Sequence, residues 1–251
     1  MANSSPLVNF VIGGTQKGGT TALDVFLRQH PEICMAHSLK EVHYFDQEKY
    51  FAGTPDYRHY HAFFKPGPQH KAVGDATPIY MYWDAAPIRI HQYNPKMKWI
   101  LALRNPVDRA FSAWNMERQR QADTLPFKDA VEQEAARCRA ALPLQHRIFS
   151  YLDRGFYARQ LRRLHELFGK ENCLVILNED LLHDHQGTLL KVLQFLGVDE
   201  TIIPPASKVF HHAYEQKLDP ELQARLTEMF RADIRELEQL IQRDLSAWCP
   251  K

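Results

Sequence analysis

The stretch Asn9-Phe-Val-Ile-Gly-Gly-Thr-Gln-Lys-Gly-Gly-Thr-Thr21 decides the fold of this chain. It starts as an apolar run typical of a buried strand, passes through a turn with four glycines, and leads into an amphipathic pattern at residues 20–29. Glycines let a backbone approach an anion closely, and a helix N-terminus presents free N–H groups to it. The stretch therefore predicts a strand, an anion-binding turn and a helix in succession.

Similar elements alternate along the rest of the chain. Further apolar runs are short and bounded by turn residues, as buried strands are, at residues 33–35, around Val73, at 99–103 and at 174–177. Amphipathic patterns typical of helices lie at residues 109–120, 157–168, 186–196 and 220–245. Strands that alternate with helices predict an α/β fold with a parallel sheet covered on both faces. We expect a single domain over residues 1–251, with a lid or insertion at about 121–147, where Pro126 and Pro143 interrupt a polar stretch.

The composition excludes several classes of protein. The 251 residues are 45% hydrophobic and carry 31 Lys+Arg against 30 Asp+Glu, so the net charge of +1 argues against a nucleic-acid partner. No apolar run approaches the roughly 20 residues needed to span a bilayer. The first residues lack the pattern of a signal peptide, and the four cysteines form no C-x-x-C pair. We expect a cytoplasmic protein with reduced thiols and no membrane span, and the sequence makes no prediction of its oligomeric state.

The glycine turn departs from the nucleotide-binding template G-x-x-x-x-G-K-(S/T) at one position. Gly14, Gly19 and Thr21 match the template, but Thr20 stands where a nucleoside-triphosphate enzyme needs its lysine. The only lysine of the turn, Lys17, lies inside the loop. A P-loop nucleotide kinase therefore stays an alternative that the misplaced lysine disfavours. A turn that only packs the first helix on the sheet is a second alternative.

A second motif with the same order of elements spans residues 98–114, Lys-Trp-Ile-Leu-Ala-Leu-Arg-Asn-Pro-Val-Asp-Arg-Ala-Phe-Ser-Ala-Trp. Its apolar strand ends at Arg104, and the helix that follows carries Ser112. Ligands of open α/β sheets bind at the carboxyl ends of strands, so Arg104 is expected to clamp a phosphate while Ser112 donates a hydroxyl. The alternative is an ion pair of Arg104 with Asp108 or Asp75.

These motifs together resemble a known family. Thr-Gln-Lys-Gly-Gly-Thr-Thr21 resembles the 5′-phosphosulfate loop of sulfotransferases that use 3′-phosphoadenosine 5′-phosphosulfate (PAPS), and Leu-Arg-Asn-Pro-Val-Asp-Arg-Ala-Phe-Ser112 resembles their 3′-phosphate loop. Lys40-Glu-Val-His-Tyr-Phe-Asp46, between them, is similar to the acidic acceptor-site motif of the heparan sulfate sulfotransferase branch. Gly74-Asp-Ala-Thr-Pro-Ile-Tyr80 and Arg154-Gly-Phe-Tyr-Ala-Arg-Gln-Leu161 also resemble segments of that branch and its bacterial relatives. The resemblance implies a P-loop NTPase-like three-layer fold with a central, mostly parallel sheet of about five strands flanked by helices.

The resemblance also implies roles for individual residues. Glu41 corresponds to the general base and Lys17 to the catalytic lysine on the phosphosulfate. His43 lies two positions from Glu41, so on an extended segment both side chains point the same way, and His43 is expected to share proton transfer or orient the acceptor. Asp46 is expected to steady the acceptor site. The implied nucleotide-binding residues are Lys17, Gly18, Gly19, Thr20, Thr21, Arg104, Ser112, Tyr157, Lys208 and Phe210.

The chain departs from the resemblance at three places. Ala76 stands where heparan sulfate enzymes often have a lysine, and no segment clearly matches their Lys-Gly-Arg loop, whose place is taken by His211-His-Ala213. Lys208 and Phe210, just upstream, are therefore expected to bind a phosphate and to stack on the adenine. No export signal is recognisable, which favours a bacterial-type enzyme.

The expected function is transfer of a sulfuryl group from PAPS, without a metal, to a hydroxyl or, as a second choice, an amine. The expected acceptor is a carbohydrate or a small natural product, and the near-neutral charge favours a small one. Besides the nucleotide kinase, a module that binds PAPS or its product 3′-phosphoadenosine 5′-phosphate (PAP) without catalysis stays an alternative. That module could dispense with Glu41.

Overall fold

The structure is a computed structural model that describes residues 7–206 and 217–250. The chain forms two compact units, Met1–Leu103 with Leu164–His211 and Arg104–Arg163 with His212–Lys251. Each unit is compact within itself, which does not decide whether either unit folds alone. The single domain over residues 1–251 therefore stays a prediction.

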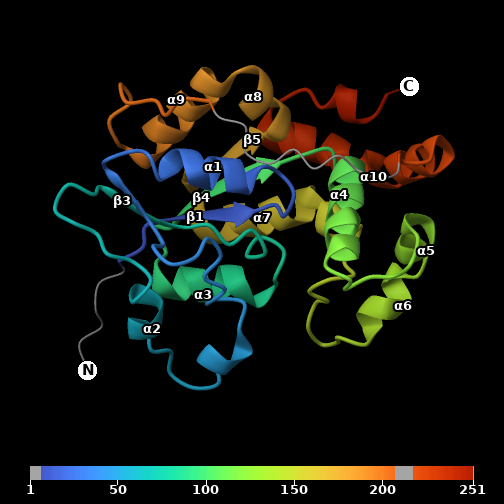
Figure 1. Cartoon of the computed structure of the whole chain (residues 1–251), viewed down its shortest axis with the longest axis horizontal. Helices are drawn as coiled ribbons and strands as arrows, with labels where there is room; N and C mark the ends of the chain where they lie inside the picture. The colour runs from blue at the N-terminus through green and yellow to red at the C-terminus, as the bar shows by residue number, and fades with distance from the viewer. Residues whose placement is uncertain (1–6, 207–216, 251) are drawn as a thin grey trace. The chain divides into compact units, whose positions relative to one another are not determined.

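The first unit is built on a five-stranded parallel sheet (Figure 1). Its strands are β1 (Phe10–Gly14), β2 (Ile33–Met35), β3 (Ala72–Asp75), β4 (Lys98–Leu103) and β5 (Cys173–Leu177). They lie in the order β2-β3-β1-β4-β5, and every neighbouring pair is parallel. The sheet confirms the predicted α/β class and all the predicted strands. In such a sheet, β1, β3 and β4 all end at the same edge.

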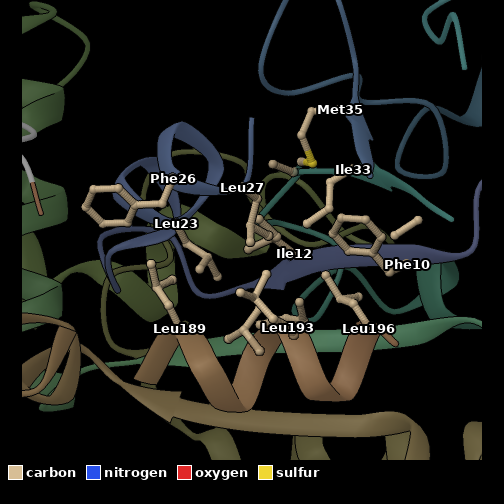
Figure 2. Packing of buried hydrophobic residues seen from close by; sticks show 14 of the residues in the cluster. Phe10, Ile12, Leu23, Phe26, Leu27, Ile33, Met35, Leu189, Leu193 and Leu196 are labelled. Carbon is tan, nitrogen blue, oxygen red and sulfur yellow. The ribbon is translucent and has the colours of Figure 1, made fainter. Parts of the chain in front are cut away.

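The helices of this unit are α1 (Thr20–Leu27), α2 (Arg58–His61), α3 (Ala85–Tyr93), α8 (Asn178–His183), α9 (His185–Leu196) and the end of α7 (Tyr157–Phe168). Leu23 of α1 and Leu193 of α9 point into one apolar core with Ile12 of β1 (Figure 2). All three are completely buried, and burial of such a side chain contributes about 1.5–3 kcal/mol. This core holds the helix that follows the glycine turn against the sheet.

The other face of the sheet explains two of the four glycines in the turn. A Cβ on Gly13 would lie 2.4 Å from the ring of Trp99, and a Cβ on Gly14 would lie 2.7 Å from the sulfur of Met81. Trp99 also packs against Phe168, with their ring centroids 5.3 Å apart. Packing against Trp99 and Met81 therefore accounts for Gly13 and Gly14, whereas the alternative drawn from the sequence was packing of the first helix on the sheet.

The second unit contains α4 (Pro106–Gln119), α5 (Phe127–Glu132), α6 (Glu134–Arg139), the start of α7 and α10 (Pro220–Ile241). Short 3₁₀ turns occur along the whole chain at Glu48–Tyr50, Asp153–Gly155, Lys170–Asn172 and Ser246–Trp248. Residues 121–147 include α5 and α6, and their role as a lid or insertion stays a prediction. The predicted helical pattern at 220–245 forms one helix, which Asp219 caps and which ends at Gln242 with a left-handed φ of 52°.

No helix among the residues described in the two units is long and apolar enough to cross a membrane.

Candidate active site

The glycine turn is anchored between two strands and a helix. The N–H of Thr15 donates to the carbonyl oxygen of Ala102 on β4 at 3.0 Å, and the side-chain amide of Asn178 at the start of α8 donates to the carbonyl of Gly18 at 3.2 Å. A Cβ on Gly18 would lie 2.0 Å from the Ala102 oxygen, so only glycine fits there. The turn is therefore held in one shape at the carboxyl ends of β1 and β4.

The same turn has a backbone conformation that suits anion binding. Lys17 and Gly19 both adopt left-handed backbone conformations, with φ values of 69° and 106°. Gly19 caps α1 and has no side chain that could accept from the first N–H groups of the helix. Thr20 and Thr21 form the first turn of α1, whose N-terminus carries partial positive charge. The structure thus brings together the five residues predicted to hold the phosphosulfate, Lys17 to Thr21, in a cradle that fits an anionic group.

Lys40 joins this cradle to the acidic motif. Its ammonium donates to the hydroxyl oxygen of Thr20 at 3.3 Å and to a carboxylate oxygen of Glu41 at 3.1 Å. The Lys40 side chain is only 21% exposed. Lys40 has no role among the residues predicted for the site, although its position next to Glu41 in a segment containing other charged residues is a usable signal.

His43 lies between two carboxylates. Its Nε2 is 3.2 Å from Glu41 Oε2, and its Nδ1 is 2.9 Å from Asp46 Oδ2. The backbone at His43 is left-handed, with a φ of 53°, so the extended segment expected there is not observed. The side chains meet because the chain turns at His43. The structure therefore brings together Glu41, His43 and Asp46.

The charges of this group follow from its contacts. Burial alone would raise the pKa of Glu41, but hydrogen bonds from His43 and Lys40 outweigh burial and hold that pKa below its ordinary value of 4.5. Burial alone would lower the pKa of His43, but Asp46 and Glu41 raise it to about 9. At neutral pH the site then contains an imidazolium and an ionised Glu41. An imidazolium has no lone pair to accept a proton, whereas Glu41 does and its side chain is 38% exposed.

The second unit places the remaining nucleotide-binding candidates around α4. Arg104 directly follows β4 in the chain, and Asn105 caps α4 by accepting from Val107 N at 2.9 Å. The buried hydroxyl of Tyr157 donates to the carbonyl oxygen of Arg104 at 2.9 Å. Ser112 lies buried on α4. Tyr157 thus holds the backbone of Arg104, and contacts of Arg104, Ser112 or Tyr157 with a nucleotide stay predictions.

Lys208 and Phe210 lie outside the described residues, so their nucleotide contacts also stay predictions. Within residues 7–206 and 217–250, no group of three or more His, Cys, Asp or Glu side chains is arranged to hold a metal ion.

Comparisons with a family model and with known proteins all point to one family. The sequence model of the family described as Sulfotransferase domain matches residues 8–220. Heparan sulfate glucosamine 3-O-sulfotransferase 3B1 of Mus musculus is 32% identical over 201 residues, which cover 80% of this chain and 49% of that protein. Heparan sulfate glucosamine 3-O-sulfotransferase 6 of Homo sapiens is 31% identical over 192 residues, which cover 76% of this chain and 53% of that protein. The chain spans about half the length of the curated relatives it matches.

Solved structures agree with the sheet described above. A sulfotransferase from Alicyclobacillus acidocaldarius has a TM-score of 0.83 and 32% sequence identity, with 96% of this chain and 98% of that chain covered. The sulfotransferase domain from the olefin synthase of Synechococcus PCC 7002 has a TM-score of 0.54 and 17% identity, with 95% of each chain covered. The second likeness shows the fold alone. Together with the parallel sheet, the likeness to the first structure confirms the predicted P-loop-like α/β fold.

Gly18→Ala is expected to destabilise the protein, because its Cβ would collide with the main chain of β4. Overpacking of this kind costs about 1–3 kcal/mol, so thermal unfolding should show a Tm lower by several degrees. Gly53→Ala is the matched control, since Gly53 is exposed and a Cβ there meets no atom within 4 Å. Equal Tm values for the two variants would contradict the tight packing of the turn.

The imidazole of His43 is expected to titrate near pH 9 in an NMR titration, well above its ordinary value of 6.5. Asp46→Asn removes the larger of the two carboxylate contributions, so the pKa of His43 should fall toward 6.5 in that variant. A His43 pKa that Asp46→Asn leaves unchanged would argue against the ion pair.

Proposed function

The chain belongs to the sulfotransferase family, and we propose that it transfers a sulfuryl group from PAPS to a hydroxyl of its acceptor, with Glu41 as general base. PAPS is the donor that the family implies. The residues fit such a donor, because Gly18 leaves no room for a side chain where the turn meets β4 and the N-terminus of α1 faces the cradle with Lys17 beside it.

The observation that carries the proposal is the bridge from Thr20 through Lys40 to Glu41. Lys40 lies 3.3 Å from the hydroxyl of the donor cradle and 3.1 Å from the carboxylate of the acidic motif. A proton acceptor and an anion cradle thus lie one ammonium group apart. Sulfuryl transfer needs this proximity, because the attacking oxygen must lose its proton while it faces the donor sulfur.

The residues divide the chemistry between them. Glu41 accepts the proton of the acceptor hydroxyl. The oxygen of that hydroxyl bonds to the sulfur of the donor, and the bond between this sulfur and the 5′-phosphate oxygen breaks. When bound, PAPS supplies the sulfuryl group and PAP departs as the leaving group. Lys17 and the N–H groups of the turn stabilise the negative charge that develops on the departing phosphate oxygen. The imidazolium of His43 keeps Glu41 ionised and oriented.

We further propose a carbohydrate hydroxyl as the acceptor. The curated relatives named above are heparan sulfate glucosamine sulfotransferases, which supports a sugar. The near-neutral chain, with a net charge of +1, supports a shorter or less anionic sugar than a sulfated polymer. Transfer of radiolabelled sulfonate from PAPS into a panel of carbohydrates and small natural products tests the acceptor directly.

Glu41→Gln is expected to lower kcat by about 10²- to 10⁴-fold, the usual contribution of a general base, while PAP affinity stays unchanged. The measurement combines a transfer assay with calorimetric PAP binding. Glu32→Gln is the matched control, because Glu32 also pairs with a lysine, Lys71, at 2.6 Å but lies outside the site. Unchanged turnover in Glu41→Gln would remove Glu41 as the base. Wild-type binding of PAP without any transfer would favour the non-catalytic module.

Arg104→Ala is expected to weaken binding of PAP by about 10- to 100-fold, the worth of a charge-assisted hydrogen-bond pair, and to change AMP binding little. The difference between PAP and AMP isolates the 3′-phosphate. Arg120→Ala serves as the control. Arg120 is an exposed arginine at the C-terminal end of α4, the helix that begins two residues after Arg104. Equal losses for PAP and AMP would contradict the assignment of Arg104.

Turnover is expected to fall as the pH rises through about 9. The pKa of His43 is raised, so its cation is present below that pH and is lost above it. In Asp46→Asn the alkaline limb should move to lower pH along with the His43 pKa. A rate that keeps rising through pH 9 in both proteins would show that the neutral imidazole is the active form.

A further inference from the structure

A buried carboxylate lies beneath the acidic motif. Asp75, at the carboxyl end of β3, is completely buried and accepts hydrogen bonds from three hydroxyls. Thr77 donates to it at 2.7 Å, Tyr80 at 2.9 Å and Tyr60 at 3.1 Å. Burial raises the pKa of Asp75 to about 6 even though these hydroxyls and the His43 cation act to lower it, so the group is ionised at neutral pH.

Two of these hydroxyls also hold the backbone of the acidic motif. The hydroxyl oxygen of Thr77 accepts from the N–H of Val42 at 2.9 Å and from the N–H of His43 at 3.4 Å. The hydroxyl oxygen of Tyr80 accepts from the N–H of Tyr44 at 3.1 Å. The three residues that directly follow Glu41 are therefore tied, through two hydroxyls, to one carboxylate.

The charge of Asp75 decides which way these hydroxyls point. A hydroxyl has one proton to donate and lone pairs that accept, and an ionised carboxylate only accepts. Asp75 therefore takes the protons of Thr77 and Tyr80, which leaves their lone pairs facing the N–H groups of the motif. An amide in place of the carboxylate could donate to either hydroxyl and reverse this order.

The tied segment contains an unfavourable backbone conformation. A left-handed φ such as the 53° of His43 is uncommon for a residue with a side chain, and it persists only where surrounding contacts impose it. The bonds from Val42, His43 and Tyr44 to the two hydroxyls are such contacts. The turn at His43 is what directs its imidazole between Glu41 and Asp46.

We propose that Asp75 is a positioning residue for the transfer reaction, and that it acts through the hydroxyls of Thr77 and Tyr80 to set the turn that pairs Glu41 with His43. The inference rests on the proposed function. Asp75 touches no reacting atom, and it works on the base through the main chain of residues 42–44. We call Asp75 with the hydroxyls of Thr77 and Tyr80 the relay. Breaking the relay should leave the donor cradle, and therefore the affinity for PAP, unchanged.

The test removes one hydroxyl at a time. Thr77→Val keeps the side-chain shape and is expected to lower kcat by about 10- to 100-fold, since a misplacement near 1 Å has an effect of that size. Thr77→Ser keeps the hydroxyl and should stay within about threefold of the wild type. PAP affinity should be unchanged in both variants. The His43 pKa in an NMR titration should fall from about 9 in Thr77→Val only, because its contact with Glu41 loosens.

Tyr80→Phe carries the same expectation and replaces Thr77→Val if that variant does not fold. Tyr93→Phe is its matched control, because the Tyr93 hydroxyl also accepts from two backbone N–H groups, those of Leu7 and Val8, each at 2.9 Å. That control removes hydroxyl bonds from the same aromatic cluster but leaves in place the ring of Tyr93 against Phe45 and the hydroxyls that accept from residues 42–44. Its kcat and His43 titration should match the wild type.

Asp75→Asn tests the relay as a unit. If Asp75 acts through Thr77, the double variant Asp75→Asn/Thr77→Val should lose no more turnover than the larger single loss. A loss of kcat in the double variant equal to the product of the two single losses would overturn the relay. Wild-type kcat and an unchanged His43 pKa in a folded Thr77→Val or Tyr80→Phe would overturn the proposal, as would a parallel loss of PAP affinity.

The two proposals fail in different ways. Absence of sulfuryl transfer by the wild type would overturn the proposed function. The His43 titration needs no acceptor. If the pKa of His43 is the same in the wild type, Thr77→Val and Tyr80→Phe, that result by itself would overturn the positioning role.

Discussion

Parallel pairing of β1 with β3 and with β4 is the constraint on which the candidate active site depends. It sends all three strands to the same edge of the sheet, so the segments that follow them leave side by side. The glycine turn follows β1, and the segment with Thr77 and Tyr80 follows β3. The glycine turn and the hydroxyls that support the acidic motif therefore lie at one edge of the sheet, although they are distant in the sequence.

The polar groups at this edge form a graded series from the interior to the surface. Asp75 is completely buried and Asp46 has a side chain with no exposure, whereas the side chains of His43 and Glu41 are each 38% exposed. The buried carboxylates act on the exposed pair, Asp75 through hydroxyls and Asp46 through the imidazole. Glu41, the proposed base, is thereby held in place at a partly exposed position, and its charge is maintained by the neighbouring cations.

Much of this arrangement was predictable where the partners are close in the chain. The glycine turn is indicated by its own spacing, and the resemblance to the family indicates Glu41, His43 and Asp46. The expected extended segment at His43 was wrong, since bonds from the β3 side impose a turn that no neighbouring residue signals. The contact of Lys40 with Glu41 is local, but its bridge to the glycine turn is not predictable from a short motif, because Thr20 lies 20 residues away in the chain. Asp75 was considered only as a partner for Arg104, whereas its hydroxyl partner Tyr60 precedes it by 15 residues.

The sequence by itself determined the parallel α/β fold and the glycine turn between β1 and α1, because hydrophobic periodicity and glycine spacing act over a few residues. The acidic motif was indicated by the resemblance to the family. Only the tertiary structure decided how Glu41 is supported, which cation reaches the cradle, and that Gly13 and Gly14 serve packing against Trp99 and Met81. These features depend on which strands become neighbours. That choice follows from burial summed over the whole sheet, which no short motif contains.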